Sequence, residues 1–374
     1  MTILAGGPGG ARLDGGGPLL LAVESSCDET GIAVIDGGRR IRSNVVASQT
    51  ALHAASGGIV PEVAARAHLR WIVPVLEGAL ADAGVTIADV DGVAVTRGPG
   101  LAGSLLVGIN FAKTLAWVHD KPLVGVNHLE GHLYAAWLTD PGEDDRPEPV
   151  FPLVALIVSG GHTFLVEMRD HLTYRLLGQT VDDAAGEAFD KVGRLLGLPY
   201  PGGPAVSRAA DAATRHDARF PRAWLGDTFD FSFSGLKTAA RRTIDDARRE
   251  EGLPIGKDAA AEPDARLSEA AVAELSWGFQ DAVVDVLVTK TIRAASGAGA
   301  RSIVLGGGVA ANGALRSRLA GEAEALGLPL IVPRPALCTD NGAMIGAAGA
   351  RRFAAGERAD LALDASPSLP LARR

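Results

Sequence analysis

The chain has 374 residues and a hydrophobic fraction of 47%, enough for two domains that each bury their own core. Its formal net charge of −8 argues against a protein that coats nucleic acid nonspecifically. The only two cysteines, Cys27 and Cys338, exclude a disulfide framework or a zinc ribbon, and no apolar run reaches the roughly 18 residues of a membrane span. We therefore expect a cytoplasmic protein that does not enter a membrane.

Strand-like and helical stretches alternate along the chain, which is the pattern of an α/β protein. The first half opens with two apolar runs, Leu19 to Glu24 and Gly31 to Asp36, around the polar turn 25–30. Farther along we expect helices at 61–81, with a kink or break at Pro74, and at 103–119, and strands at 92–96 and 123–127.

The second half repeats the opening pattern, because two apolar runs, Leu153 to Val158 and Thr163 to Glu167, surround the turn 159–162. It continues with expected helices at 183–196, 267–295 and 341–353 and a strand at 302–305. We interpret the repetition as a duplication that produces two lobes, each opening with a strand–turn–strand hairpin.

Domain boundaries follow from composition. The predicted parts are a flexible Gly-rich head at 1–17, an N-terminal lobe at 18–145, a C-terminal lobe at 146–358 with an exposed insertion at 250–266, and a tail at 359–374. For the last helix of the C-terminal lobe, we leave open that it packs back onto the N-terminal lobe.

Two glycine-rich turns follow predicted strands, at Ser159-Gly160-Gly161-His162 and at 306–312, which ends in Asn312. Backbone N–H groups in such turns can hold phosphate oxygens, although a single turn of this kind is often only a tight turn. Neither turn has the spacing of a P-loop or of a dinucleotide-binding fingerprint. Two such turns at matching strand ends therefore favour a nucleotide-binding protein whose fold is neither of the P-loop nor of the dinucleotide-binding class.

His128 and His132 are four residues apart, so on a helix they lie about 40° apart and can share a metal ion. In a zinc protease the glutamate directly follows the first histidine, whereas Glu130 is two residues on and about 200° round the helix. This argues against a protease. Taken alone, the pair is more often two buried histidines with hydrogen-bond partners.

Asp340 is a candidate third ligand, although a residue in front of a helix is more commonly an N-cap. Two histidines and one carboxylate suit Fe²⁺ or another divalent ion. Asp183, Glu187 and Asp190 share one face of a predicted helix, so a ribose, a cation or Lys191 should offset their charge unless that face is simply solvated.

Many long motifs together resemble the tRNA N6-adenosine threonylcarbamoyltransferase family, the bacterial TsaD group once described as glycoproteases. The resemblance runs from about residue 21 to residue 363. Its markers include Glu24-Ser25-Ser26-Cys27-Asp28-Glu29-Thr30-Gly31, Gly98-Pro99-Gly100-Leu101, His128-Leu129-Glu130-Gly131-His132, Ser159-Gly160-Gly161-His162, Tyr200-Pro201-Gly202-Gly203-Pro204 and 338–344. The chain departs from the family at Ser25, Asn127 and Ser207, and Ser207 puts one nucleotide contact in doubt.

The resemblance implies a two-lobed, actin-like ATPase (ASKHA) fold with a central nucleotide cleft. It implies one divalent metal, usually assigned as Fe²⁺, on His128, His132 and Asp340. The implied nucleotide contacts are Ile157, Val158, Ser159, Gly160, Gly161, Asp190, Gly203 and Asn312.

The implied reaction moves threonylcarbamoyl from threonylcarbamoyl-AMP to N6 of the adenosine 3′ of the anticodon, in tRNAs that read codons beginning with A. The adenine nucleotide in the site would be this donor or ATP. The implied partners are tRNA, a paralogous TsaB-type subunit bound through the N-terminal lobe, and a small TsaE-type ATPase.

Asp28 and Glu29, in the first hairpin turn, are candidates to take the proton from the adenine amine. A small-molecule kinase or ATPase of the same fold is the alternative function. A metalloprotease and a noncatalytic scaffold are weaker alternatives.

Overall fold

The computed structural model describes residues 17–54, 58–143, 146–255 and 266–372. The predicted head and most of the predicted insertion lie outside the described residues. The chain forms two compact units. The first contains the described residues up to Pro149 together with Asp170–Thr173 and the segment from Pro333 onward; the second contains Val150–Arg169 and Tyr174–Val332.

The first unit is built on a five-stranded sheet of order β3-β2-β1-β4-β5. Its buried central strand, β1, pairs antiparallel with β2 and parallel with β4. The next pairs outward are antiparallel β2–β3 and parallel β4–β5. The strands are β1 (Leu19–Glu24), β2 (Glu29–Asp36), β3 (Arg40–Ser48), β4 (Gly92–Gly98) and β5 (Leu123–Asn127).

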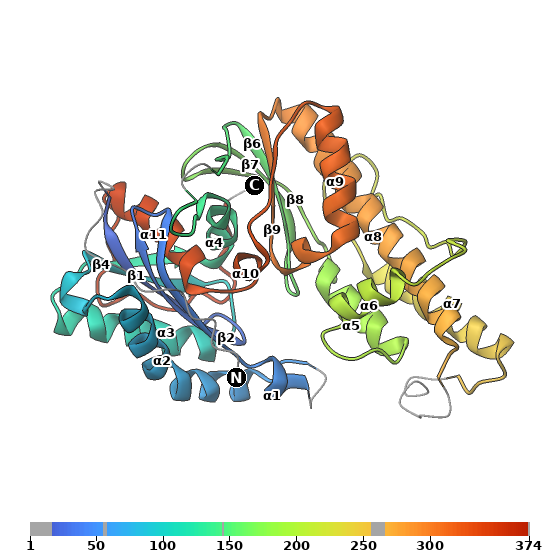
Figure 1. Cartoon of the computed structure of the whole chain (residues 1–374), viewed down its shortest axis with the longest axis horizontal. Helices are drawn as coiled ribbons and strands as arrows, with labels where there is room; N and C mark the ends of the chain where they lie inside the picture. Colours follow the sequence, from blue (N-terminus) through green and yellow to red (C-terminus); the bar gives the residue numbers. More distant parts are fainter. Residues whose placement is uncertain (1–16, 55–57, 144–145, 256–265, 373–374) are drawn as a thin grey trace. The chain divides into compact units, whose positions relative to one another are not determined.

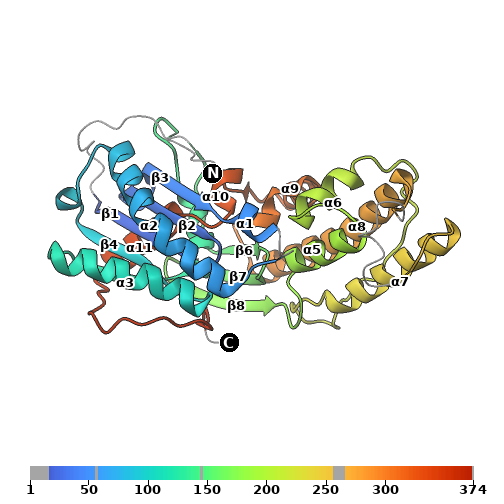
Figure 2. The same cartoon turned by 90° about the horizontal axis from the view of Figure 1, so that it is seen from below.

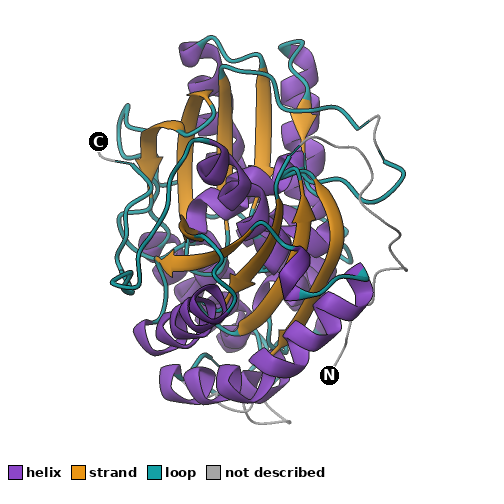
Figure 3. Ribbon diagram, turned by 90° about the vertical axis from the view of Figure 1, so that its left-hand side faces the viewer, coloured by secondary structure: helices purple, strands orange, loops and turns teal. Residues whose placement is uncertain are grey.

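Helices cover both faces of this sheet. α2 (Pro61–Ala83) and α3 (Ala102–Val118) pack together on one face, and α11 (Gly342–Ala354) packs on the other (Figure 1). Figure 3 shows the strands with helices packed against them. The shorter helices are α1 (Thr50–Ala54), η1 (Ile87–Asp89), α4 (His128–Tyr134), η2 (Ala135–Trp137) and α10 (Pro335–Cys338). α2 does not break at Pro74: proline removes one backbone donor, and the buried side chains on both sides of it keep the helix on the sheet.

The C-terminal segment, residues 359–372, lies along β4 and β5 instead of trailing from the last helix as a tail. The Ala359 N–H donates to the carbonyl of Leu123 at 2.8 Å, and the Ser366 N–H donates to the carbonyl of Arg97 at 2.7 Å. Leu363 is buried in the core of the first unit. α11 belongs to this unit as well, packed on its sheet (Figure 2).

The second unit has a sheet of order β10-β9-β6-β7-β8. Its buried central strand, β6, pairs antiparallel with β7 and parallel with β9, which pairs parallel with β10. The strands are β6 (Leu153–Val158), β7 (Thr163–Asp170), β8 (Thr173–Gln179), β9 (Ser302–Gly306) and β10 (Leu330–Ile331). The helices are α5 (Ala185–Leu195), α6 (Gly202–Ala210), α7 (Ser234–Glu250), α8 (Glu269–Ala298), η5 (Gly308–Ala311) and α9 (Gly313–Ala325).

The two sheets have the same strand order about their central strand, with β6, β7, β8, β9 and β10 in the places of β1, β2, β3, β4 and β5. The predicted duplication of a strand–turn–strand unit is therefore present, and the α/β fold class is confirmed. Among the described helices, none combines the length and the apolar character that crossing a membrane requires.

Candidate functional site

The histidine pair lies where β5 ends and α4 begins. The Asn127 side chain accepts a hydrogen bond from the Leu129 N–H at 2.9 Å, which caps the helix so that it starts at His128. Positions four apart then bring both imidazoles to one side of α4, with ring centroids 4.8 Å apart. Both side chains are buried, so the pair lies inside the first unit.

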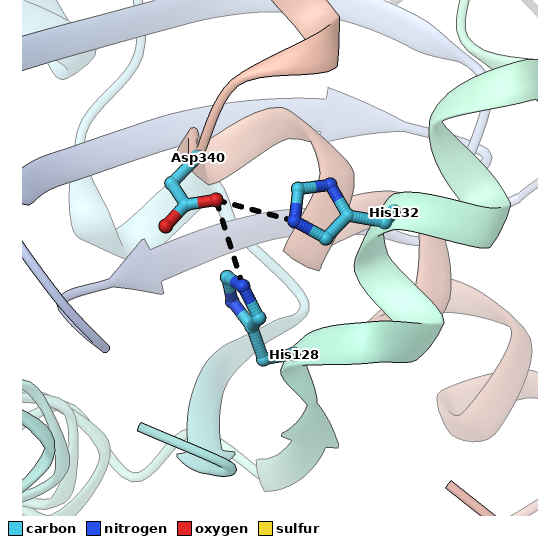
Figure 4. A group of neighbouring side chains, drawn as sticks. All are labelled: His128, His132 and Asp340. Carbon is cyan, nitrogen blue, oxygen red and sulfur yellow. Dashed lines mark ion pairs between the residues drawn. The ribbon is translucent and has the colours of Figure 1, made fainter. Parts of the chain in front are cut away.

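Asp340 faces the two histidines from the loop between α10 and α11 (Figure 4). Its Oδ1 lies 3.5 Å from Nε2 of His128 and 3.2 Å from Nε2 of His132. Asp340 is not the N-cap of α11, because the side chain of Asn341 accepts the capping hydrogen bond from the Met344 N–H. The carboxylate is thus available to the histidines.

These three residues fit a divalent metal ion. One ligand atom from each lies within 4.8 Å of the others. Apart from the 3.2 Å approach of Nε2 to Asp340, neither ring nitrogen of His132 has a hydrogen-bond partner among the described residues, although the side chain is only 1% exposed. A buried imidazole without hydrogen bonds calls for an explanation, and a cation between two histidines and a carboxylate supplies one.

Glu24 supports His128 from behind, a contact that the sequence did not predict. Its Oε2 lies 3.0 Å from Nδ1 of His128 and accepts a hydrogen bond from the Thr96 hydroxyl at 2.7 Å. This contact orients Nε2 toward Asp340, as an outer-shell carboxylate does for a metal-binding histidine. The detectable signal was a charged residue at the end of a fully buried strand.

Burial moves the pKa values of His128 and Glu24 in opposite directions, and nearby charges reverse both shifts. Desolvation lowers the pKa of His128, but the negative charges of Asp340 and Glu24 outweigh it and raise that pKa to about 9. Burial raises the pKa of Glu24, yet its interaction with His128 leaves it below the usual value. The two carboxylates therefore favour positive charge at His128, as they would favour a cation between them.

Glu130 points away from the metal group, as its position on the helix predicted. Its carboxylate is fully buried and accepts hydrogen bonds from Nε and Nη2 of Arg352 at 2.7 and 2.6 Å. A carboxylate held by a guanidinium on α11 is not free to act as the base of a protease.

Asp28 lies in the turn before β2 and Glu29 is the first residue of that strand, in the same unit as the metal group. Burial raises the pKa of Glu29, and the nearby charges of Asp28 and Asp340 raise it further. His68 on α2 fixes this turn, since its Nε2 lies 3.0 Å from the Cys27 carbonyl and its Nδ1 lies 2.7 Å from Oγ1 of Thr30.

The first glycine turn closes the end of β6 in the second unit. Ile157 and Val158 are fully buried in the strand, and the Ser159 N–H donates to the His162 carbonyl at 2.8 Å. Gly160 and Gly161 are exposed, and a Cβ on either would meet no atom within 4 Å. Their backbone is open to a ligand.

The other predicted nucleotide residues surround this turn within the second unit. The Gly186 N–H on α5 donates to the Ser159 carbonyl at 3.2 Å, and α5 also contacts α6 and η5. On α5, Asp190 accepts a hydrogen bond from the Gly202 N–H at 2.7 Å, next to Gly203. Burial raises the pKa of Asp190, and backbone hydrogen bonds from Gly202 and Gly203 oppose that rise.

Asn312 follows η5 and caps α9 by accepting from the Leu315 N–H at 2.9 Å, while its amide donates to Gln280 at 2.7 Å. Gly307 brings the second glycine turn against β6. Its φ is +84°, and a Cβ there would lie 2.4 Å from the Val158 carbonyl oxygen. The two predicted glycine turns therefore end adjacent strands of one sheet.

The helix expected from residue 183 begins at Ala185, so Asp183 precedes α5 and only Glu187 and Asp190 of the predicted acidic face lie on it. Asp183 accepts from the ammonium groups of Lys191 and Lys237, each at 2.8 Å, and Lys191 also pairs with Glu187 at 2.8 Å. Lys191, one of the predicted partners, therefore offsets the clustered charge.

Comparison with known proteins agrees with these features. The family model described as tRNA N6-adenosine threonylcarbamoyltransferase (TsaD) matches residues 40–347. The tRNA N6-adenosine threonylcarbamoyltransferase of Thermomicrobium roseum is 54% identical over 95% of this chain and 98% of its own length. That of Moorella thermoacetica is 51% identical over 94% of this chain and 97% of its own length.

The fold is also similar to a solved structure, full-length HypF in a phosphate- and nucleotide-bound form, with a TM-score of 0.57 at 14% identity. The alignment covers 91% of this chain and 47% of the HypF chain, and at this identity it bears on the fold alone. The extent and identity of the sequence matches show that the chain belongs to the tRNA N6-adenosine threonylcarbamoyltransferase family.

Proposed function

We propose that this protein transfers a threonylcarbamoyl group to N6 of an adenosine in tRNA. The names of relatives that match nearly the whole chain support the reaction. The observation that carries it to this chain is the buried group of His128, His132 and Asp340, which a plain phosphotransferase has no need to build. The acceptor we propose is the adenosine 3′ of the anticodon in tRNAs that read codons beginning with A.

The proposed donor is threonylcarbamoyl-AMP, a mixed carbamic–phosphoric anhydride. The N6 amine attacks the carbamoyl carbon, a C–N bond forms, and the bond from that carbon to the phosphate oxygen breaks. AMP leaves with the electron pair, and the amine loses one proton. Because the anhydride is already activated, the protein needs no nucleophile of its own.

The glycine turns of the second unit are the proposed holders of the leaving nucleotide. Gly160 and Gly161 present open backbone to its phosphate, with Asp190, Gly203 and Asn312 around them. A divalent metal, which we propose to be Fe²⁺, would be held by His128, His132 and Asp340 and would supply Lewis-acid polarisation of an oxygen. The proposed proton acceptor is Asp28 or Glu29, at the half-buried turn before β2.

An apolar surface on α2 and α3 is the proposed contact for a paralogous TsaB-type subunit. Leu69 and Val73 lie one helical turn apart on α2 and are 65% and 49% exposed. On α3, Leu106 and Trp117 are about 20° apart around the helix, with Trp117 71% exposed. We name these four side chains the α2–α3 surface. Exposed apolar groups on two adjacent helices are typical of a protein interface.

A small-molecule kinase or ATPase of the same fold is the alternative function. It predicts phosphate transfer from ATP to a small acceptor, with no dependence on the two histidines. Its support is the fold shared with HypF.

One reconstitution separates the two functions. The protein is combined with TsaB-type and TsaE-type subunits, threonylcarbamoyl-AMP and unmodified tRNA, and nucleosides from the digested tRNA are measured by mass spectrometry. We expect the threonylcarbamoylated adenosine with the wild-type protein and its loss with His128→Ala. His216→Ala, which removes an exposed histidine of the second unit, is the matched control.

Metal content, measured by inductively coupled plasma mass spectrometry, is read in parallel. Loss of both metal and product in His128→Ala, with neither lost in the control, supports the proposal. Full product formation without metal would refute the role of the histidines. Phosphate transfer from ATP without any modified nucleoside would favour the kinase.

For the α2–α3 surface, Trp117→Glu is expected to prevent copurification of the TsaB-type subunit. Leu326→Glu, on the exposed end of α9 in the second unit, is expected to leave it intact. Equal binding by both variants would contradict the proposed contact.

A further inference from the structure

Arg97 occupies an irregular position in the first unit. Thr96 of β4 pairs with Val126 of β5, and Gly98 pairs with Asn127, so Arg97 is an extra residue in β4. Bulges of this kind redirect a side chain and are common beside functional sites. The regular pairing of β4 with β5 is therefore interrupted at one cationic residue, Arg97.

The guanidinium of Arg97 has unused hydrogen-bonding capacity. Its Nε is buried and has no hydrogen-bond partner, and no ion pair or hydrogen bond holds the rest of its side chain within the part of the chain that the structure describes. A buried donor that remains unsatisfied destabilises the folded protein, and more so when the group is charged. A buried donor without a partner calls for an explanation, and a bound ligand that accepts from it is one.

Arg97 lines a pocket of about 210 Å³ between β5, the residues that follow α11, and the C-terminal segment. The pocket also contains the charged side chains of Arg352, Arg358 and Glu357, and its apolar wall includes Leu363 and Leu369. Gly125 makes room for this arrangement, because a Cβ there would lie 3.1 Å from Cδ of Arg97 and 2.9 Å from Cδ1 of Leu363.

The other two arginines of the pocket already have partners. Arg352 pairs with Glu130 and Glu357. Arg358 lies over the Phe353 ring at 3.6 Å and donates to the Phe353 carbonyl at 2.9 Å. Arg97 therefore differs from them, because its buried Nε has no partner, and the three guanidinium groups outnumber the single carboxylate that lines the pocket.

We propose that this pocket binds a small oxyanion, with Arg97 as its main ligand. A guanidinium presents a planar fork of donors that matches phosphate or carboxylate oxygens, and an apolar wall strengthens the pairing by excluding water. The volume is below the roughly 300 Å³ at which pockets for drug-sized ligands begin, so it suits a phosphate, a pyrophosphate or a small dicarboxylate.

The residues that line the pocket include none of the metal group, and Asn127 and Pro370 among them connect the pocket to the start of α4. The Asn127 amide donates to the Pro370 carbonyl at 3.0 Å, and the same side chain caps α4 in front of His128. An anion that ties Arg97 to the C-terminal segment would also steady this cap.

Isothermal titration calorimetry of the full chain tests the site, with inorganic phosphate in one arm and succinate in the other. We expect binding of at least one of them at one site, weakened about tenfold or more by Arg97→Ala. Arg70→Ala, which removes an exposed arginine of α2, is the matched control and should bind as the wild type does. Binding of phosphate alone, or of succinate alone, identifies which oxyanion the pocket takes.

Two further variants keep the test decisive. Asn312→Ala alters the proposed nucleotide site, so phosphate binding that survives Asn312→Ala and is lost in Arg97→Ala supports the pocket; the reverse pattern overturns it. Arg97→Lys retains the charge without the fork and should bind with intermediate affinity, which maintains the test if the alanine variant does not fold. Absence of heat from both anions at about 10 mM would overturn the proposal.

Discussion

Replacing Glu24 by glutamine tests how the buried metal group is oriented. Both oxygens of the Glu24 carboxylate accept hydrogen bonds. Oε1 accepts from the Ser26 N–H, and Oε2 accepts from the Thr96 hydroxyl and also faces Nδ1 of His128. An amide cannot accept at both positions. If its NH₂ replaces Oε1, two donors face each other at Ser26.

If the NH₂ replaces Oε2, it donates to Nδ1 of His128, and the ring proton moves to Nε2. That is the nitrogen nearest Asp340, so it can no longer bind a cation. Loss of such an outer-shell partner typically lowers metal affinity about 10- to 100-fold, which equals about 1.4–2.7 kcal/mol.

The assay is isothermal titration calorimetry, in which metal-free protein is titrated with Fe²⁺ under anaerobic conditions. Glu274→Gln is the control, because Glu274 is another buried carboxylate and holds three backbone N–H groups of residues 214–216 in the second unit. We expect weaker metal binding in Glu24→Gln and wild-type affinity in Glu274→Gln. Equal affinity in the wild type and Glu24→Gln would refute the orienting role.

Two other substitutions test the support around the sites. Gly307→Ala should lower the free energy of unfolding by about 2–4 kcal/mol in urea titrations, because the methyl group meets the Val158 carbonyl and φ is positive; Gly313→Ala, with open space around it, should not be destabilising. Burial lowers the pKa of His68, so the unfolded chain takes up its proton at a higher pH than the folded protein. The stability that neutral His68 contributes is present above about pH 6.5 and is lost as the pH falls through the lowered pKa of the folded protein. The His68→Gln variant should therefore lose less stability than the wild type when the pH is lowered from 7.5 to about 5.5.

A destabilised Gly313→Ala would show that the close contact at Gly307 is not the cause. Identical pH dependence in the wild type and His68→Gln would show that His68 is not held neutral. The second outcome would also show that the contacts of His68 with Cys27 and Thr30 do not depend on a neutral ring.

Features set by local periodicity could be predicted from the sequence. The two hairpins, the helix at 103–119 and the placement of His128 and His132 on one helical side follow from residue spacing alone, and the structure has them. α7 was not predicted, although residues 234–250 form a regular helix with Leu236, Ala240 and Ile244 on its buried side. Its many arginines and aspartates obscured that pattern.

Long-range contacts account for the rest. Nothing near Glu24 in sequence indicates that it faces His128, 104 positions away. The C-terminal segment has no periodic pattern because it is held by scattered backbone hydrogen bonds to β4 and β5. The free guanidinium of Arg97 depends on a register shift between two strands, and a shift of this kind leaves no mark in composition.

The most direct measurement of the central proposal follows a single product. Unmodified tRNA is incubated with the reconstituted proteins and threonylcarbamoyl-AMP, and the N6-threonylcarbamoylated adenosine is quantified by mass spectrometry for the wild type and His132→Ala. Our account predicts product with the wild type, and product and bound metal both lost in His132→Ala, because that imidazole is buried with a metal-ligand geometry and no other partner among the described residues. Wild-type yield from a folded, metal-free His132→Ala protein would contradict it.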